Sequence, residues 1–249
     1  MQDSNQFAGR FLGVLGGMGP LAGATFVNRL VLLTPATSDQ HHIPAILWND
    51  PRVPGRPAAF LHQGEDPLPW MLNGIRHLEQ AGAQAIAIPC NTAHLWFDAM
   101  QAHTRLPILH IVDAVIANLR DSGITDGRVG LLATGATLAS QLYQTALTAN
   151  GYECVVPESD EIERWCTAPI GLVKENRLDD AQEALTPGVA ALHGRGVQAV
   201  ILGCTELPLA LPLARRTWDM PIVDSIDALA RAAIAWYFDS SLAPYSPSN

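Results

Sequence analysis

The chain has 249 residues, of which 48% are hydrophobic and 16% charged, and its mean hydropathy is +0.13, as is typical of a soluble globular protein. Its net charge of −9 and the lack of a Lys/Arg cluster argue against nucleic acid as a partner. No apolar run reaches membrane-spanning length, and MQDSNQFAGR does not have the pattern of a secretory signal, so we expect no membrane association and a cytoplasmic location.

Short apolar runs recur along the chain, and each ends in a turn residue or a cysteine. Strands of a parallel sheet have this pattern because they are buried on both faces, so we expect strands at 11–15, 43–47, 85–88, 129–132 and 199–202. Stretches with an apolar spacing of about 3.6 residues alternate with them and predict helices, for example at 67–81, 138–149, 178–193 and 225–238. This alternation predicts an α/β protein with parallel sheets covered by helices.

Three pairs of segments match between the two halves of the chain. GVLGGMG at 13–19 matches GLLATGA at 130–136, QAIAIPCNT at 84–92 matches QAVILGCTE at 198–206, and PILHIVDA at 107–114 matches PIVDSIDA at 221–228. The offsets are 117, 114 and 114 residues. So constant a separation indicates an internal duplication that gives two similar lobes.

The last matching pair suggests where the lobes begin and end. PIVDSIDA mirrors a segment near the end of the first half, so the helix that follows it should pack back on the first lobe. We predict a first lobe of residues 1–115 plus 224–249 and a second lobe of residues 116–223. Ligands of such sheets bind beyond the carboxyl ends of the strands, so the duplicated strand ends should face one another across a cleft.

Two of the four cysteines occupy the same place in the two halves. Cys90 in IPCNTAH and Cys204 in LGCTELP each follow an apolar strand, whereas Cys154 and Cys166 have no mirrored partner and are interpreted as structural. Their number and spacing do not fit a disulfide scaffold or a CxxC metal site, so free thiols are expected. A single buried cysteine is commonly a small hydrophobe, but a mirrored pair indicates a shared function.

Thiols on opposite sides of a ligand fit a reaction that inverts a stereocentre. One group removes the α-proton from one face, and a second, protonated group delivers a proton to the other. A thiol suits both roles because its reference pKa is about 8.5. Asn91, Thr92 and Thr205 directly follow the cysteines, where polar side chains and backbone amides at a helix start can bind a carboxylate and stabilise a developing carbanion.

His94 follows Cys90 closely and raises the question of a Cys/His nucleophilic pair or a metal site. No third ligand with suitable spacing stands out, and the adjacent His41 and His42 would point in opposite directions on a strand. We interpret His94 as a residue that supports the cysteine loop or caps a helix, and its catalytic involvement stays open. No metal is expected.

The GVLGGMGP, IPCNTAH and LGCTEL segments resemble those of the aspartate/glutamate racemase superfamily, and the PCNTAH block at 89–94 is most similar to the aspartate racemase branch. The resemblance covers nearly the whole chain. It implies two flavodoxin-like lobes, related by a pseudo-two-fold axis, with the active site between them. It also implies catalysis without pyridoxal phosphate or metal, hence no cofactor, and a small acidic amino acid held between Cys90 and Cys204.

The resemblance further assigns residues that hold the substrate. PRVPGR matches a family segment that places Arg56 at the distal carboxylate, for which a guanidinium is well suited, and Lys174 in PIGLVKEN matches a second cation. Their plainer alternatives are an exposed loop arginine and a solvated lysine. Asn49 is expected to line the cleft or to occupy a turn. Thr137 matches a threonine of the second lobe's loop, although the family's TTGT is TGAT here.

The loop GGMGPLA also fits a loose G-x-G-x-x-A pattern, the outline of a dinucleotide fingerprint. Asp39, the acidic residue at the expected distance, precedes the next apolar run instead of ending it. A tight turn at the cleft explains the glycines and Pro20 equally well, and the resemblance places Met18 near the substrate. A nucleotide-dependent oxidoreductase is therefore the weakest alternative.

The sequence thus predicts a racemase that interconverts L- and D-aspartate, with glutamate as an additional or poorer substrate. One alternative is a related two-cysteine enzyme of the maleate isomerase or hydantoin racemase type. Another is a two-lobed protein that binds a small acid without reacting, although such a protein would not need paired thiols. The resemblance also suggests a homodimer.

Overall fold

A computed structural model of the chain describes residues 9–211 and 218–239. The predicted first lobe includes residues 1–8 and 240–249, and the predicted second lobe includes 212–217; these segments lie outside the described residues. Among the helices that are described, none is both long and apolar enough to cross a membrane.

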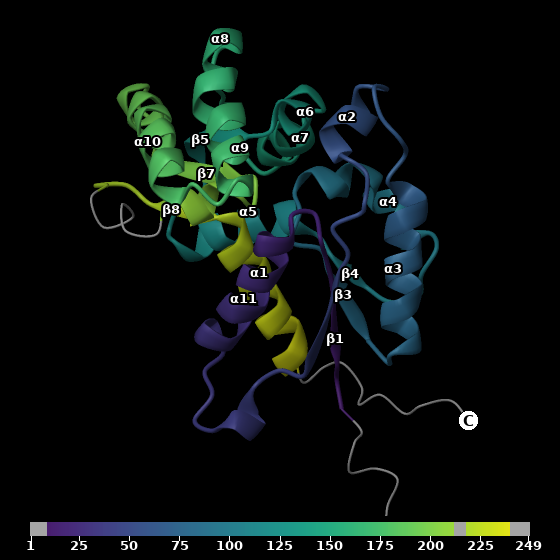
Figure 1. Cartoon of the computed structure of the whole chain (residues 1–249). Coiled ribbons are helices and arrows are strands. Elements are labelled where there is room, and N and C mark those ends of the chain that lie inside the picture. Colours follow the sequence, from purple (N-terminus) through teal and green to yellow (C-terminus); the bar gives the residue numbers. More distant parts are fainter. Residues whose placement is uncertain (1–8, 212–217, 240–249) are drawn as a thin grey trace, which may run out of the picture.

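The described chain forms two four-stranded sheets with equivalent strand orders (Figure 1). The first has the order β2-β1-β3-β4 and contains β1 (Leu12–Gly16), β2 (Ala45–Asn49), β3 (Ala85–Ala87) and β4 (Ile108–Leu109). The second has the order β6-β5-β7-β8 and contains β5 (Gly127–Ala133), β6 (Tyr152–Val155), β7 (Ala199–Gly203) and β8 (Ile222–Asp224). All strand pairs are parallel, which confirms the predicted fold class.

Helices cover the sheets. On the first sheet, α3 (Leu68–Gln80) lies on one side, and α1 (Pro20–Leu33) and α11 (Ser225–Phe238) lie on the other (Figure 1). The first half also contains α2 (Arg56–Phe60), α4 (Phe97–Gln101) and α5 (Ile111–Asp121). The second half contains α6 (Gly135–Ala139), α7 (Leu142–Ala149), α8 (Ser159–Ile162), α9 (Ala168–Lys174) and α10 (Leu178–Gly194).

The central strands were predictable because they are buried on both faces. Every residue of β1, β3 and β7 is buried, so their sequences are continuous apolar runs. β6 is an edge strand in which Glu153 is exposed, and its sequence does not have this signal. The structure therefore adds β6, and the short strands β4 and β8, to the strands predicted from the sequence.

Helices α5 and α11 join the two halves. α11 packs along α1 and α5, and Arg29 of α1 forms two hydrogen bonds to the Asp227 carboxylate of α11. One hydrophobic cluster contains Val14 of β1, Leu131 of β5 and Leu229 of α11, so the two sheets share part of one core. The lobe boundaries near residues 115 and 223 stay a prediction.

The single helix predicted at 138–149 is wrong, because the structure has two helices there, α6 and α7. Gln141 separates them and has a left-handed backbone with φ of 58°. A left-handed residue cannot continue a right-handed helix. Apolar periodicity does not reveal a break of this kind, since the buried side chains keep their spacing on both sides of it.

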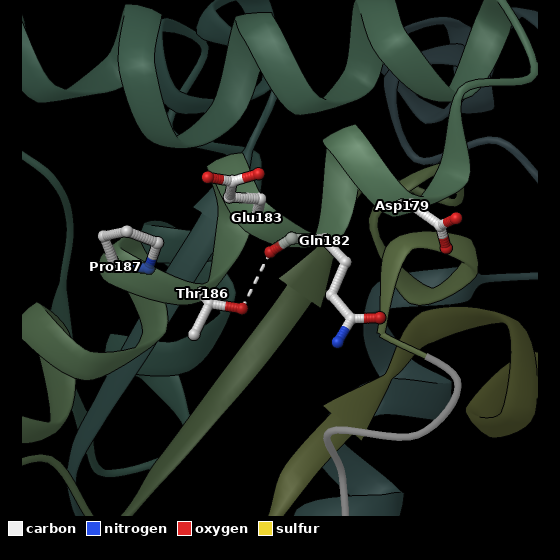
Figure 2. A pocket seen from close by; sticks show the side chains of 5 residues that line it. All are labelled: Asp179, Gln182, Glu183, Thr186 and Pro187. Carbon is white, nitrogen blue, oxygen red and sulfur yellow. Dashed lines mark hydrogen bonds between the residues drawn. The ribbon is translucent and has the colours of Figure 1, made fainter.

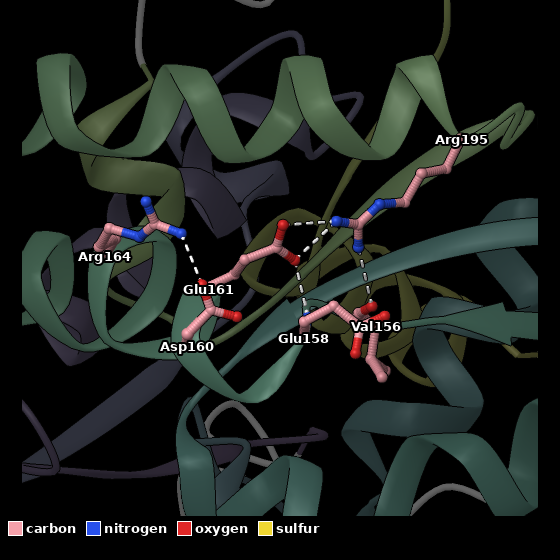
Figure 3. A network of polar contacts seen from close by, with 6 residues as sticks. All are labelled: Val156, Glu158, Asp160, Glu161, Arg164 and Arg195. Carbon is pink, nitrogen blue, oxygen red and sulfur yellow. Dashed lines mark hydrogen bonds and ion pairs between the residues drawn. The ribbon is translucent and has the colours of Figure 1, made fainter.

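A continuous helical segment in the second half ends near the strand ends of the cleft described below. It consists of α8, a π-helical turn (Glu163–Thr167) and α9. Figure 3 shows the polar network at its start, where Arg195 donates to both carboxylate oxygens of Glu161. Glu161 also accepts from the Glu158 backbone N–H and so completes a capping box. These contacts anchor the segment whose other end carries Lys174.

Candidate active site

The two mirrored cysteines lie at the carboxyl ends of equivalent strands, Cys90 after β3 and Cys204 after β7. Both side chains are buried, with exposed fractions of 5% and 4%. They line one cleft whose walls contain Met18, Arg56, Pro57, Cys90, Asn91, Thr92, Thr134, Ile170, Lys174, Cys204, Thr205 and Glu206. The cleft therefore combines residues that follow strands of both sheets, where open α/β sheets place their ligands.

Two residues predicted at the cleft lie elsewhere. Asn49 is exposed at the end of β2, and its side-chain amide is 3.5 Å from the carbonyl oxygen of Pro20. Thr137 is fully buried, and its hydroxyl lies 3.1 Å from that of Thr92 and 2.9 Å from that of Thr134. Thr134, the N-cap of α6, takes the place in the cleft wall that the sequence had suggested for Thr137.

The Cys90 thiol lies beside a cation. Its pKa is raised overall: burial raises it most, the Arg56 guanidinium lowers it, the charge of Glu206 raises it, and a hydrogen bond from the Ala93 backbone N–H lowers it. Arg56 is the first residue of α2, and one of its terminal nitrogens donates to the carbonyls of Val53 and Pro54 at 3.2 and 3.0 Å. Its buried Nε has no hydrogen-bond partner, so the guanidinium retains donor capacity at the cleft.

The Cys204 thiol lies beside a carboxylate. Its Sγ is 3.1 Å from Oε2 of Glu206, which also accepts from the Thr205 hydroxyl at 3.3 Å. Burial raises the pKa of Cys204 well above its ordinary value, and the negative charge of Glu206 raises it further. Cys90 and Cys204 thus occupy equivalent positions but have neighbours of opposite charge.

Glu206 is the main cleft residue that the sequence analysis missed. It is 114 positions after Thr92, so the duplication places a carboxylate in the second half where the first half has a hydroxyl. The signal in the sequence was its place in the matched segment QAVILGCTE, two residues after the cysteine; the structure adds that it is buried. An acidic residue is rarely buried unless it has a partner, and this one has Cys204 and Thr205.

His94 supports the cysteine loop and caps a helix. Its Nε2 accepts from the backbone N–H of Ile111, the first residue of α5, at 3.2 Å. Its Nδ1, which must then carry the proton, donates to the Cys90 carbonyl at 2.9 Å. Burial and, less strongly, His110 lower the pKa of His94 to about 3, so the ring is neutral at physiological pH. Both nitrogens are used, and His94 does not line the cleft.

Asn91 links the cysteine loop to the second half of the chain. Its side-chain oxygen accepts from the Tyr143 hydroxyl of α7, and its amide nitrogen donates to the Ser225 hydroxyl of α11 at 3.0 Å. All three residues are buried. The Asn91 side chain is therefore held in place by α7 and α11, and its role in substrate binding stays a prediction.

Tyr143→Phe is expected to reduce the free energy of unfolding by about 1–3 kcal/mol, because the buried Asn91 oxygen loses its donor. Urea denaturation would measure this change. Tyr152→Phe is a matched control, since its equally buried hydroxyl donates to the Ile124 carbonyl, away from the cleft. We expect both variants to lose stability but only Tyr143→Phe to lower kcat/KM. An equal effect on kcat/KM would contradict the link.

The glycine-rich loop makes a tight turn at the cleft. Gly17 has φ of 90°, and a Cβ there would lie 2.1 Å from the carbonyl oxygen of Asp50. Pro20 is the first residue of α1, as the turn interpretation predicts, and Met18 lines the cleft. The structure thus supplies a steric reason for the glycine pattern that requires no nucleotide.

Lys174 lies at the end of α9, exposed at the edge of the cleft. It is the only lysine in the sequence, although the chain has many arginines. The structure thus brings Lys174 to the cleft, and the role that the family resemblance gave it stays a prediction.

A further groove lies outside the cleft. Figure 2 shows a groove of about 390 Å³ on α10, lined by Asp179, Gln182, Glu183, Thr186 and Pro187. The Thr186 hydroxyl there donates to the Gln182 carbonyl within the helix. Within residues 9–211 and 218–239, no group of three or more His, Cys, Asp and Glu side chains is placed to hold a metal ion.

Known proteins share both the sequence pattern and the fold. Residues 15–233 match the family described as Asp/Glu/Hydantoin racemase. The chain is 25% identical to the broad specificity amino-acid racemase RacX of Bacillus subtilis, over 91% of this chain and 97% of that protein. An aspartate racemase from Picrophilus torridus superposes with a TM-score of 0.80 and 34% identity over 92% of this chain and 94% of that chain. An aspartate racemase homologue from Pyrococcus horikoshii superposes with a TM-score of 0.73 and 25% identity, over 92% of this chain and 99% of that chain. The chain therefore belongs to the Asp/Glu/hydantoin racemase family and is an isomerase.

Proposed function

We propose that this protein interconverts L- and D-aspartate, and less efficiently glutamate, with Cys90 and Cys204 as the two acid/base groups. The observation that carries the proposal is the pair of buried thiols in one cleft, each at the end of an equivalent strand and each beside a different charge. Arg56 favours a thiolate at Cys90, and Glu206 favours a thiol at Cys204. Burial raises the pKa of both thiols, and these opposite charges make Cys90 the thiol expected to ionise first as the pH rises.

The reaction is a proton transfer through a carbanion. The Cys90 thiolate takes the α-proton and becomes a thiol, and the electron pair of the C–H bond stays on the α-carbon, delocalised into the α-carboxylate. Cys204 then delivers its proton to the opposite face and becomes a thiolate. Backbone N–H groups that follow the strand ends, together with the cations of the cleft, would stabilise the charge that develops on the carboxylate.

An acidic side chain is favoured by the charges at the cleft. Arg56 offers a half-buried guanidinium whose Nε has no hydrogen-bond partner, and Lys174 adds a second cation at the edge. The aspartate racemase of Picrophilus torridus, with 34% identity, supports the same assignment. The homodimer and the cytoplasmic location expected from the sequence stay predictions. Size-exclusion chromatography with light scattering would test whether the protein is a dimer.

The test is incubation of the purified enzyme, without added cofactor, with L-aspartate in D₂O and with L-glutamate in parallel. Chiral chromatography with mass spectrometry should detect D-aspartate that carries deuterium at the α-carbon. If the folded enzyme leaves the α-proton of aspartate in place, the proposal is contradicted. The alternatives, a related two-cysteine isomerase or racemase and a protein that binds a small acid without reacting, would then be favoured.

Glu206→Gln is expected to lower the pKa of Cys204, because the variant removes the negative charge that raises it. With one thiol and one thiolate required, kcat/KM should rise with pH as Cys90 ionises and fall as Cys204 ionises. Burial raises the pKa of both thiols, so the wild-type optimum should lie above neutral pH. The variant should move the alkaline limb of the profile to lower pH by more than the acid limb. An alkaline limb that stays in place would refute this role of Glu206.

A further inference from the structure

A second cavity lies next to the cleft. It has a volume of about 240 Å³, and its walls contain Gly19, Pro20, Leu21, Ala22, Val173, Lys174, Asn176 and Glu206. Lys174 and Glu206 are in the walls of both cavities. The cleft that contains the thiols has a volume of only about 20 Å³, close to the space that one water molecule needs. The room for a large substituent therefore lies beyond Lys174 and Glu206.

The chemistry of the inversion fixes how a substrate lies relative to this second cavity. Each thiol needs access to one face of the α-carbon. The amino group, the carboxylate and the side chain must therefore point outward from the line that joins Cys90 and Cys204. Lys174 lies at one edge of the cleft, in one of these outward directions. A side chain directed toward Lys174 and too long to end there continues into the second cavity.

The walls of the second cavity favour an uncharged, apolar end of the side chain. The start of α1 contributes Pro20, Leu21 and Ala22, and α9 contributes Val173. Lys174 and Glu206 bring one positive and one negative charge to the wall, so the cavity has no net charge that would favour an ionic end of the side chain. At about 30 Å³ for each water-sized group, the cavity of about 240 Å³ has room for about eight such groups, more than the four carbons of a norleucine side chain.

We propose that this second cavity is the side-chain subsite for amino acids whose unbranched side chains are longer than that of aspartate and end in an apolar group, such as norleucine. The proposal rests on the proposed racemase function and extends its substrate class. Aspartate is held by the cations of the cleft, and the longer substrates gain their binding from apolar contacts with α1 and α9.

The test compares α-deuterium incorporation from L-norleucine and L-aspartate in D₂O by the wild type and by Leu21→Trp. Leu21 is 42% exposed, so a larger side chain there can reach into the cavity without disturbing the core. Leu32→Trp is the matched control, because Leu32 lies on the same helix, is 63% exposed and does not line either cavity. Activity on aspartate reports folding of every variant.

We expect the wild type to exchange both substrates and Leu21→Trp to lower kcat/KM for norleucine by about tenfold or more, with that for aspartate within about twofold. Leu32→Trp should change neither value. Exchange of aspartate alone by the wild type, or a Leu21→Trp variant with an unchanged ratio of the two values, would overturn the subsite and leave the racemase function intact. Exchange of no amino acid at all would overturn the proposed function and the subsite with it.

Discussion

Cys90→Ser and Cys204→Ser are each expected to lower the rate of aspartate racemisation by about 10²–10⁴-fold, the range for loss of a general acid or base. A serine hydroxyl keeps the size and place of the thiol but does not ionise near physiological pH. The reaction needs a proton acceptor on one face and a donor on the other, so either replacement alone should stop inversion. Polarimetry or chiral chromatography of L-aspartate solutions measures the loss directly.

Cys154→Ser is the matched control for these variants. Cys154 lies on β6, outside the cleft, and burial raises the pKa of its thiol to about 12. Its replacement should leave kcat/KM within about twofold, as is usual for changes away from the reacting groups. Racemisation by either cleft variant at the rate of Cys154→Ser would show that the thiol in question takes no part in catalysis.

Arg56→Met is expected to lower kcat/KM for aspartate by about 10²–10³-fold, since loss of one partner of a buried charge pair costs about 2–5 kcal/mol. Arg56 has a buried Nε without a partner at the cleft and lies beside Cys90. Its loss should also raise the pKa of Cys90 and move the acid limb of the pH profile upward. Steady-state kinetics from about pH 6 to 10 measure both effects.

Arg52→Met is the control for this prediction, because Arg52 belongs to the same PRVPGR segment but is an exposed partner of Asp50. It should change kcat/KM by no more than about twofold, as expected for a surface ion pair. Arg56→Met should also affect aspartate much more than a neutral amino acid, if its partner is the distal carboxylate. Equal losses for both substrates would instead assign Arg56 to the α-carboxylate.

The cysteine pair was predictable because it belongs to a duplicated pattern. The two strand ends repeat at an offset of 114 residues, and the structure brings both thiols to one cleft. Arg56 and Lys174 required a family resemblance, since a loop arginine and a helix-end lysine have no distinguishing pattern. Glu206 was missed because the duplication suggested symmetry, and the carboxylate is the point at which the two halves differ.

Structural roles at the cleft were harder to predict than its composition. Asn91, Thr137 and His94 all lie near the cysteines in sequence or space, and their side chains are bound by other parts of the protein. Asn91 is bound by Ser225 of α11, Thr137 by Thr92 of the cysteine loop, and His94 by the first backbone N–H of α5. Local patterns predict which residues are near a strand end, but only the tertiary packing decides which side chains are free to bind a substrate.

The most direct test of the two-thiol account is face-specific exchange by the single variants. Cys90→Ser and Cys204→Ser should each be incubated in D₂O with L-aspartate and, separately, with D-aspartate, and α-deuterium should be followed by NMR. Each variant retains one thiol, so it should exchange the α-proton of one enantiomer without inversion, and the two variants should prefer opposite enantiomers. Exchange of the same enantiomer by both variants, or of both enantiomers by either one, would contradict the assignment of Cys90 and Cys204 to opposite faces.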